Sequence, residues 1–162
     1  MRWFRFAVLT SLFTVLQASL LADLNIKPDL LLILMVFFAI YCNTSSAVIT
    51  SFTIGFAADI IMVGSAMGPQ MISFGLFGTA LAYLHRVITI RKMPYQALAI
   101  FVTALLAGLL AHFLGFLRGE PTTPNIYAVL FWTSLFSGLV GPFLFLPSAW
   151  WMRIKIDRFR RQ

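Results

Sequence analysis

The sequence contains very few charged residues. Asp, Glu, Lys and Arg together make up 10% of its 162 residues, whereas an ordinary soluble domain devotes roughly a quarter of its chain to them. Apolar residues make up 60% of the chain. Because so little polar surface is available, we expect most of the outer surface to face membrane hydrocarbon rather than water.

Residues that commonly form catalytic and metal sites are also scarce. Cys42 is the only cysteine, which excludes an intrachain disulfide and a thiolate metal site. The two histidines, His85 and His112, are expected on opposite sides of the membrane and cannot share a metal. The five acidic residues form no pair, and neither a GxSxG motif nor a Gly-rich phosphate loop with Lys occurs. We therefore expect no metal, no cofactor and no enzymatic activity.

Six apolar stretches remain when the chain is divided at charges, Pro, Gly and polar clusters. They cover residues 6–22, 30–42, 47–63, 70–84, 94–117 and 126–149. At about 20 residues for each transmembrane helix, these stretches use nearly the whole chain. The sequence therefore predicts an all-α, polytopic membrane protein with one integral membrane domain over residues 1–162.

The positions of the basic residues predict the orientation, because Lys and Arg in short loops stay cytoplasmic. With the N-terminus inside, ten of the twelve basic residues fall on the cytoplasmic side, and only Lys27 and Arg118 face out. Both termini are therefore predicted to be cytoplasmic. The basic tail of residues 150–162 suits either an interface helix on anionic lipid or a simple stop-transfer flank. Basic clusters between apolar runs do not indicate nucleic-acid binding.

Small residues recur at helical spacing in the later stretches, and in lipid such faces let helix backbones approach closely. One face holds Ser51 and Gly55, followed by Ala58. Another face contains small residues of the fifth stretch, namely Ala104, Gly108 and Gly115. Both faces favour a bundle of closely packed helices. Pro142, inside the last stretch, is expected to kink that helix or break its hydrogen-bond ladder.

Asp59 is the one acidic residue inside an apolar stretch, where a charge is costly unless it finds a partner or water. Counted from the outer helix ends, Asp59 and His112 lie at similar depth. We hypothesise that Asp59 faces the bundle interior or an outward-facing cavity, with His112 or Arg118 as its partner. The alternative is an acid at a helix end that reaches the outer interface.

Two motifs stand out in this apolar background. PDLLLI begins at Pro28 and Asp29, and GFAADI begins at Gly55 and includes Asp59. A final apolar stretch that includes residues 131–142 and ends in a basic tail follows them. In these features the sequence resembles the MreD family of bacterial rod shape-determining proteins, over nearly its whole length.

This resemblance implies a six-helix bundle in the bacterial inner membrane, similar in fold to the substrate-binding subunits of energy-coupling-factor transporters. The implied function is that of a non-enzymatic scaffold of the cell-elongation complex. It binds the bitopic protein MreC and, together with RodA, a class B penicillin-binding protein and MreB, helps to organise peptidoglycan synthesis and cell shape. The alternative is a substrate-binding subunit of a vitamin-type transporter with an outward-facing pocket. Short outer loops of modest polarity favour the scaffold.

The scaffold interpretation also predicts where an MreC-like partner binds. Its transmembrane segment is expected to lie against one of the two small-residue faces. Gly55→Leu or Gly108→Leu should then abolish co-purification with the partner and leave membrane insertion intact.

Overall fold

The computed structural model describes residues 3–19, 28–61, 68–87, 93–119 and 125–152. They form α1 (Trp3–Ser19), α2 (Leu30–Tyr41), α3 (Thr44–Ile61), α4 (Pro69–Val87), α5 (Met93–Leu117) and α6 (Ile126–Met152). The predicted all-helical fold and its order of six helices are confirmed. The last helix is longer than expected and includes Trp150 and Trp151 of the predicted tail, while residues 153–162 lie outside the described part.

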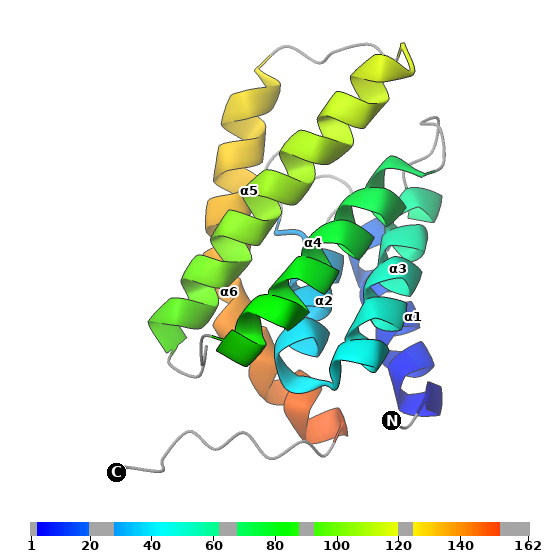
Figure 1. The fold of residues 1–162 in the computed structure, drawn as a ribbon, viewed down its shortest axis with the longest axis vertical. Helices are drawn as coiled ribbons and strands as arrows, with labels where there is room; N and C mark the ends of the chain where they lie inside the picture. Colours follow the sequence, from blue (N-terminus) through cyan, green and yellow to red (C-terminus); the bar gives the residue numbers. More distant parts are fainter. Residues whose placement is uncertain (1–2, 20–27, 62–67, 88–92, 120–124, 153–162) are drawn as a thin grey trace.

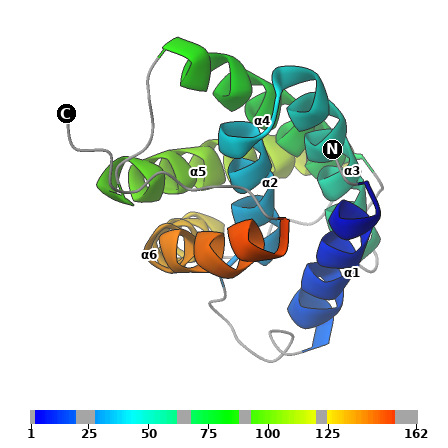
Figure 2. The same cartoon turned by 90° about the horizontal axis from the view of Figure 1, so that it is seen from below.

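Helix α2 occupies the centre of the bundle (Figure 1). Eleven of its twelve residues are buried, from Leu30 to Ile40, and all five other helices contact it. Figure 2 shows α2 with the other helices arranged around it. The residues of α2 are apolar on every side, as is typical of a helix that is shielded from water all around.

The six helices differ in their capacity to cross a membrane. In the described part of the chain, three are long and apolar enough, namely Thr44–Ile61, Pro94–Leu117 and Ile126–Trp151. Helix α2 has 12 residues and so measures about 18 Å, against about 30 Å for the hydrocarbon core. Helix α2 is therefore shorter than the hydrocarbon core is thick, and the other helices enclose it.

Glycines bring the helices of two neighbouring pairs into close contact. A Cβ placed on Gly55 of α3 would lie 2.7 Å from the Cα of Met71 in α4. A Cβ on Gly138 of α6 would lie 3.1 Å from the carbonyl oxygen of Ala97 in α5. A Cβ at Gly55 would force the backbone of α4 to shift, and one at Gly138 would make a tight contact with the backbone of α5. The small-residue pattern thus corresponds to packing within the chain.

Two prolines, Pro142 and Pro147, lie inside α6. The helix is nevertheless continuous from Ile126 to Met152, and it changes direction along its length in Figure 1. A proline has no N–H, so each removes one hydrogen bond from the ladder without ending the helix here. Pro142 is buried among the neighbouring helices that contact α6, whereas Pro147 is exposed.

The start of α1 and the end of α6 meet at one end of the bundle (Figure 1). A guanidinium nitrogen of Arg5, Nη1, lies 3.4 Å from the carbonyl oxygen of Trp151. The described start and end of the chain therefore lie at the same end of the bundle.

Candidate functional site

Asp59, near the end of α3, caps the first turn of α4. Its carboxylate accepts hydrogen bonds from the backbone N–H groups of Gly68, Gln70 and Met71, each at 3.0 Å. The side chain is 3% exposed. The first N–H groups of a helix lack partners within the helix and lie at the positive end of its dipole. The acid in the apolar stretch therefore satisfies the start of the next helix.

The predicted partners of Asp59 were His112 and Arg118, whereas the three hydrogen bonds described above come from backbone amides. Arg118 lies close by, since a Cβ on Gly68 would be 3.3 Å from its Nη2 atom. Gly68 has a φ of 125°, which favours glycine, and it lies between Asp59 and Arg118. His112 packs instead against Tyr127, with ring centroids 6.3 Å apart.

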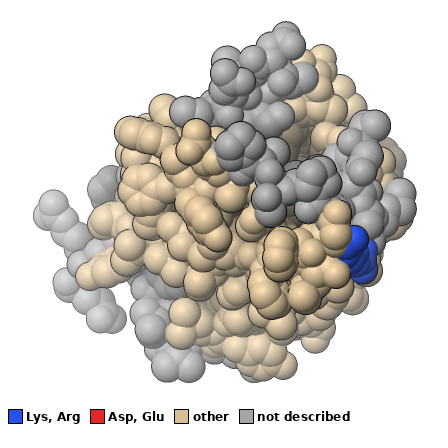
Figure 3. Space-filling model, turned by 90° about the horizontal axis from the view of Figure 1, so that it is seen from above, with Lys and Arg blue, Asp and Glu red and all other residues tan. Residues whose placement is uncertain are grey.

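The face that contains the ends of α3 and α5 is mostly uncharged (Figure 3). In the part of the chain that the figure colours, one blue patch lies at the rim and no acidic atom is visible. Arg118 is exposed at this end, whereas the Asp59 carboxylate is buried. Backbone amides rather than water therefore solvate the acid.

A second polar cluster fixes the start of the central helix. Asp29 is the N-cap of α2 and accepts a hydrogen bond from the N–H of Leu32 at 3.1 Å. The Gln17 amide of α1 donates to Asp29 at 3.2 Å and accepts from the N–H of Leu31 at 3.0 Å. The N–H of Asp29 donates to the hydroxyl of Ser137 in α6 at 2.8 Å. Three helices are joined at this point.

This second cluster lies inside the bundle rather than at its end. Ser137 follows the first residue of α6, Ile126, by eleven positions, which corresponds to about 16 Å along the helix axis. Pro28 and Asp29, which were expected near the outer surface, are both only partly exposed. A helix that starts at such depth needs protein partners for its free N–H groups, because water is scarce there.

The two faces predicted for a partner helix are filled from within the chain. Ser51 and Ala58 are buried on α3, and a Cβ on Gly78 of α4 would contact the Ser51 side chain. On α5, Ala104 and Gly115 are buried and Gly108 lies against Leu130 of α6; these are the remaining predicted residues. Small residues mark where backbones approach, but the pattern does not distinguish the chain's own helices from those of a partner.

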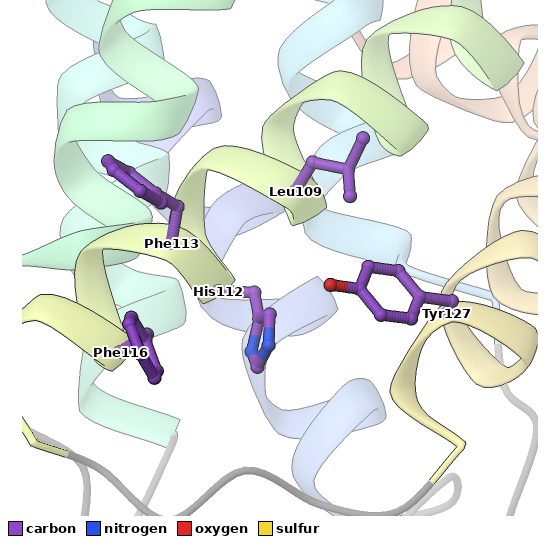
Figure 4. Close-up of a pocket in the computed structure, with 5 residues that line it drawn as sticks. All are labelled: Leu109, His112, Phe113, Phe116 and Tyr127. Atoms are coloured by element: carbon purple, nitrogen blue, oxygen red, sulfur yellow. The ribbon is translucent and has the colours of Figure 1, made fainter.

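An open cavity of about 490 Å³ lies between the upper parts of α5 and α6. Leu109, His112, Phe113 and Phe116 of α5 line it together with Tyr127 of α6 (Figure 4). No group of three His, Cys, Asp or Glu side chains that could hold a metal ion occurs among the described residues. The cavity therefore offers aromatic surface and two polar groups.

The two capping acids, Asp29 and Asp59, have the same structural role. Both accept hydrogen bonds from backbone N–H groups at the start of a helix, and so they hold these helices in place. The fold and these contacts define an all-α membrane protein with a fixed bundle. Residues 1–154 match the family described as rod shape-determining protein MreD, and the chain belongs to this family.

Membership of this family gives the chain a role in rod shape determination. None of the curated proteins compared with the chain matches it, and none of the solved structures does either.

Proposed function

We propose that the protein is a non-enzymatic scaffold of the cell-elongation complex in the bacterial inner membrane. On this proposal it binds an MreC-like bitopic protein and, with RodA, a class B penicillin-binding protein and MreB, helps to organise peptidoglycan synthesis. The family match over residues 1–154 carries the proposal. The capped acids support it, because Asp29 and Asp59 make the bundle rigid and a rigid platform suits a binding role.

A cytoplasmic position of both termini is part of the proposal. The contact between Arg5 and Trp151 supports this part of the proposal, because the described ends of the chain lie at the same end of the bundle. Trp3, Trp150 and Trp151 are all exposed at this end, where Trp is typical of a membrane interface. The basic residues near both termini favour the cytoplasmic side.

The partner helix is proposed to lie along an exposed seam of α6. The seam consists of large apolar residues spaced alternately four and three apart: Trp132, Phe136, Leu139, Phe143, Leu146 and Trp150. This spacing repeats every seven residues, as in helices that pack side by side. The seam measures about 27 Å, close to the thickness of a bilayer core, so one transmembrane helix can follow it throughout.

The transporter alternative makes a different demand on the structure. A vitamin-binding subunit needs several polar groups that converge on one pocket. The described cavity between α5 and α6 has two, His112 and Tyr127, and no charged side chain lines it. The similarity to energy-coupling-factor subunits therefore stays a proposal about fold, supported by the order of six helices, and the scaffold is favoured.

Cysteine cross-linking tests the scaffold and the seam together. In a Cys42→Ser background, Leu139→Cys and Phe143→Cys would each be co-expressed with an MreC-like protein that carries single cysteines in its transmembrane segment. We expect both to form disulfides with the partner, whereas Leu98→Cys, an equally exposed control on α5, should not. Cross-links from Leu98→Cys alone would reject the seam. Failure of the unmodified protein to co-purify with the partner would reject the scaffold.

A further inference from the structure

The cavity between α5 and α6 results from a change in residue size along the two helices. At Gly108 the helices touch, because a Cβ there would contact Leu130. Beyond that point the facing residues are large, and His112 and Tyr127 meet edge to face. The helices diverge toward their upper ends in Figure 1. The rings line the resulting opening and leave about 490 Å³ unfilled, within the usual range for ligand sites.

The lining of the cavity has one apolar part and one polar part. Leu109, Phe113 and Phe116 provide hydrocarbon and ring surface along two turns of α5. The imidazole of His112 and the phenol of Tyr127 provide hydrogen-bonding groups from opposite walls, and the phenol oxygen points toward α5 (Figure 4). A ligand that matches this lining is itself divided into an apolar chain and a polar group that accepts hydrogen bonds.

The cavity opens sideways, onto the outer surface of the bundle. Phe113, Phe116 and Tyr127 are 56%, 60% and 68% exposed. They lie on the two helices Pro94–Leu117 and Ile126–Trp151, each long and apolar enough to cross a membrane. The exposed sides of such helices face lipid, so a ligand enters from the bilayer and not from water.

The depth of the polar groups agrees with this direction of entry. Tyr127 is the second residue of α6, and His112 lies five residues before the end of α5, or about 8 Å along the axis. Polar aromatic side chains near helix ends sit at the level of lipid headgroups. The apolar part of the lining includes Leu109, which lies deeper by about one turn.

From this arrangement we infer that the cavity is a binding site for one membrane phospholipid. Its phosphate accepts hydrogen bonds from His112 and Tyr127, and one acyl chain lies against Leu109 and Phe113. The site is separate from the α6 seam and from the Asp59 cap. The inference therefore does not depend on the proposed scaffold function.

Photolabelling of the full-length protein tests the inference. The purified protein would be reconstituted with phosphatidylglycerol that carries a photoreactive diazirine in one acyl chain, and labelled peptides would be identified by mass spectrometry. We expect labels to concentrate on residues 109–116 of α5. Tyr127→Phe and His112→Phe should each reduce this labelling by about tenfold, as expected when a hydrogen bond to a charged phosphate is lost.

Matched controls separate a specific site from general lipid contact. Tyr95→Phe removes an equally exposed phenol at the other end of α5 and should leave the labelling unchanged. Inorganic phosphate should not compete, because it lacks the acyl chain; competition would show a free-phosphate site and overturn the inference. Equal labelling of all exposed helix faces would also overturn it. So would a cross-link from His112→Cys to a partner helix accompanied by loss of the lipid label.

Discussion

The carboxylate of Asp59 accepts a hydrogen bond from the backbone N–H of Met71 at 3.0 Å, across the interface between α3 and α4. Gly55, one turn before Asp59, allows this approach because a Cβ at that position would lie 2.7 Å from the Cα of Met71. The lack of a side chain at Gly55 thus lets α3 and α4 approach each other, and the Asp59 carboxylate then binds the start of α4. Both residues belong to the GFAADI motif, so the motif encodes one helix junction.

Replacement of Asp59 should weaken the bundle strongly. Asp59→Ala removes the acceptor of the partly buried N–H groups of Gly68, Gln70 and Met71, and we expect a loss of about 3 kcal/mol in the free energy of unfolding. Asp59→Asn retains one acceptor oxygen and should lie between Ala and the wild type. Thermal unfolding in detergent measures both.

The control for Asp59 is another capping residue in an exposed place. Asn43 accepts a hydrogen bond from the N–H of Thr44 at 2.9 Å, and Asn43→Ala should cost about 1 kcal/mol. If Asp59→Ala is no more harmful than Asn43→Ala, the three amide contacts do not stabilise the bundle as described.

Two glycine substitutions should differ sharply in their effect on stability, although each adds one methyl group. Gly55→Ala meets the backbone of α4, which cannot move aside, and should destabilise the protein by about 2 kcal/mol. Gly108→Ala meets the side chain of Leu130, which can rotate, and the gain in helix propensity partly offsets the contact. Unfolding midpoints in detergent compare the two, and equal losses would contradict this account.

The link between α2 and α6 can be tested on α6 alone. Ser137→Ala removes the acceptor of the Asp29 N–H inside the bundle and should cost about 1–2 kcal/mol. Ser148 is also buried, but its hydroxyl donates to the carbonyl of Leu144 in its own helix. Ser148→Ala should therefore be close to neutral. If Ser148→Ala lowers the stability more than Ser137→Ala in a urea or heat titration, the result would argue against the depth assigned to Asp29.

Cys42, in the turn between α2 and α3, should react slowly with alkylating reagents. Burial raises the pKa of its thiol to about 11, so the reactive thiolate is rare at neutral pH and its fraction rises with pH. The rate with iodoacetamide should increase about tenfold for each pH unit from 7 to 10 without levelling. In a Cys42→Ser background, the exposed Ser45→Cys should instead level off near pH 9. A plateau for Cys42 in that range would contradict the raised pKa.

The number and positions of the helices could be predicted because each is an apolar run bounded by charged or polar residues. The run after Asp29 was predicted as a short membrane span, because a helix without a polar side suits lipid as well as a protein interior. Its short length was visible in the sequence. Only the three-dimensional arrangement shows that it starts inside the bundle, beside Ser137.

The partners of the buried acids could not be predicted in the same way. Asp59 binds backbone amides, and amides are present at every position of a sequence. Asp29 and Ser137 are 108 residues apart in the chain, and Gln17 had no feature that distinguished it from other polar residues. The sequence identified Asp59 as an acid that needs a partner, but which backbone segment supplies its hydrogen bonds depends on packing.

The enclosed position of α2 also constrains the order of events during synthesis. With 12 residues it is too short to cross the bilayer as an independent helix, and its start is completed by Ser137, which emerges from the ribosome more than a hundred residues later. Until α6 has been made, the N–H of Asp29 lacks its hydroxyl acceptor. The core around α2 therefore stays incomplete until the last helix has joined the bundle.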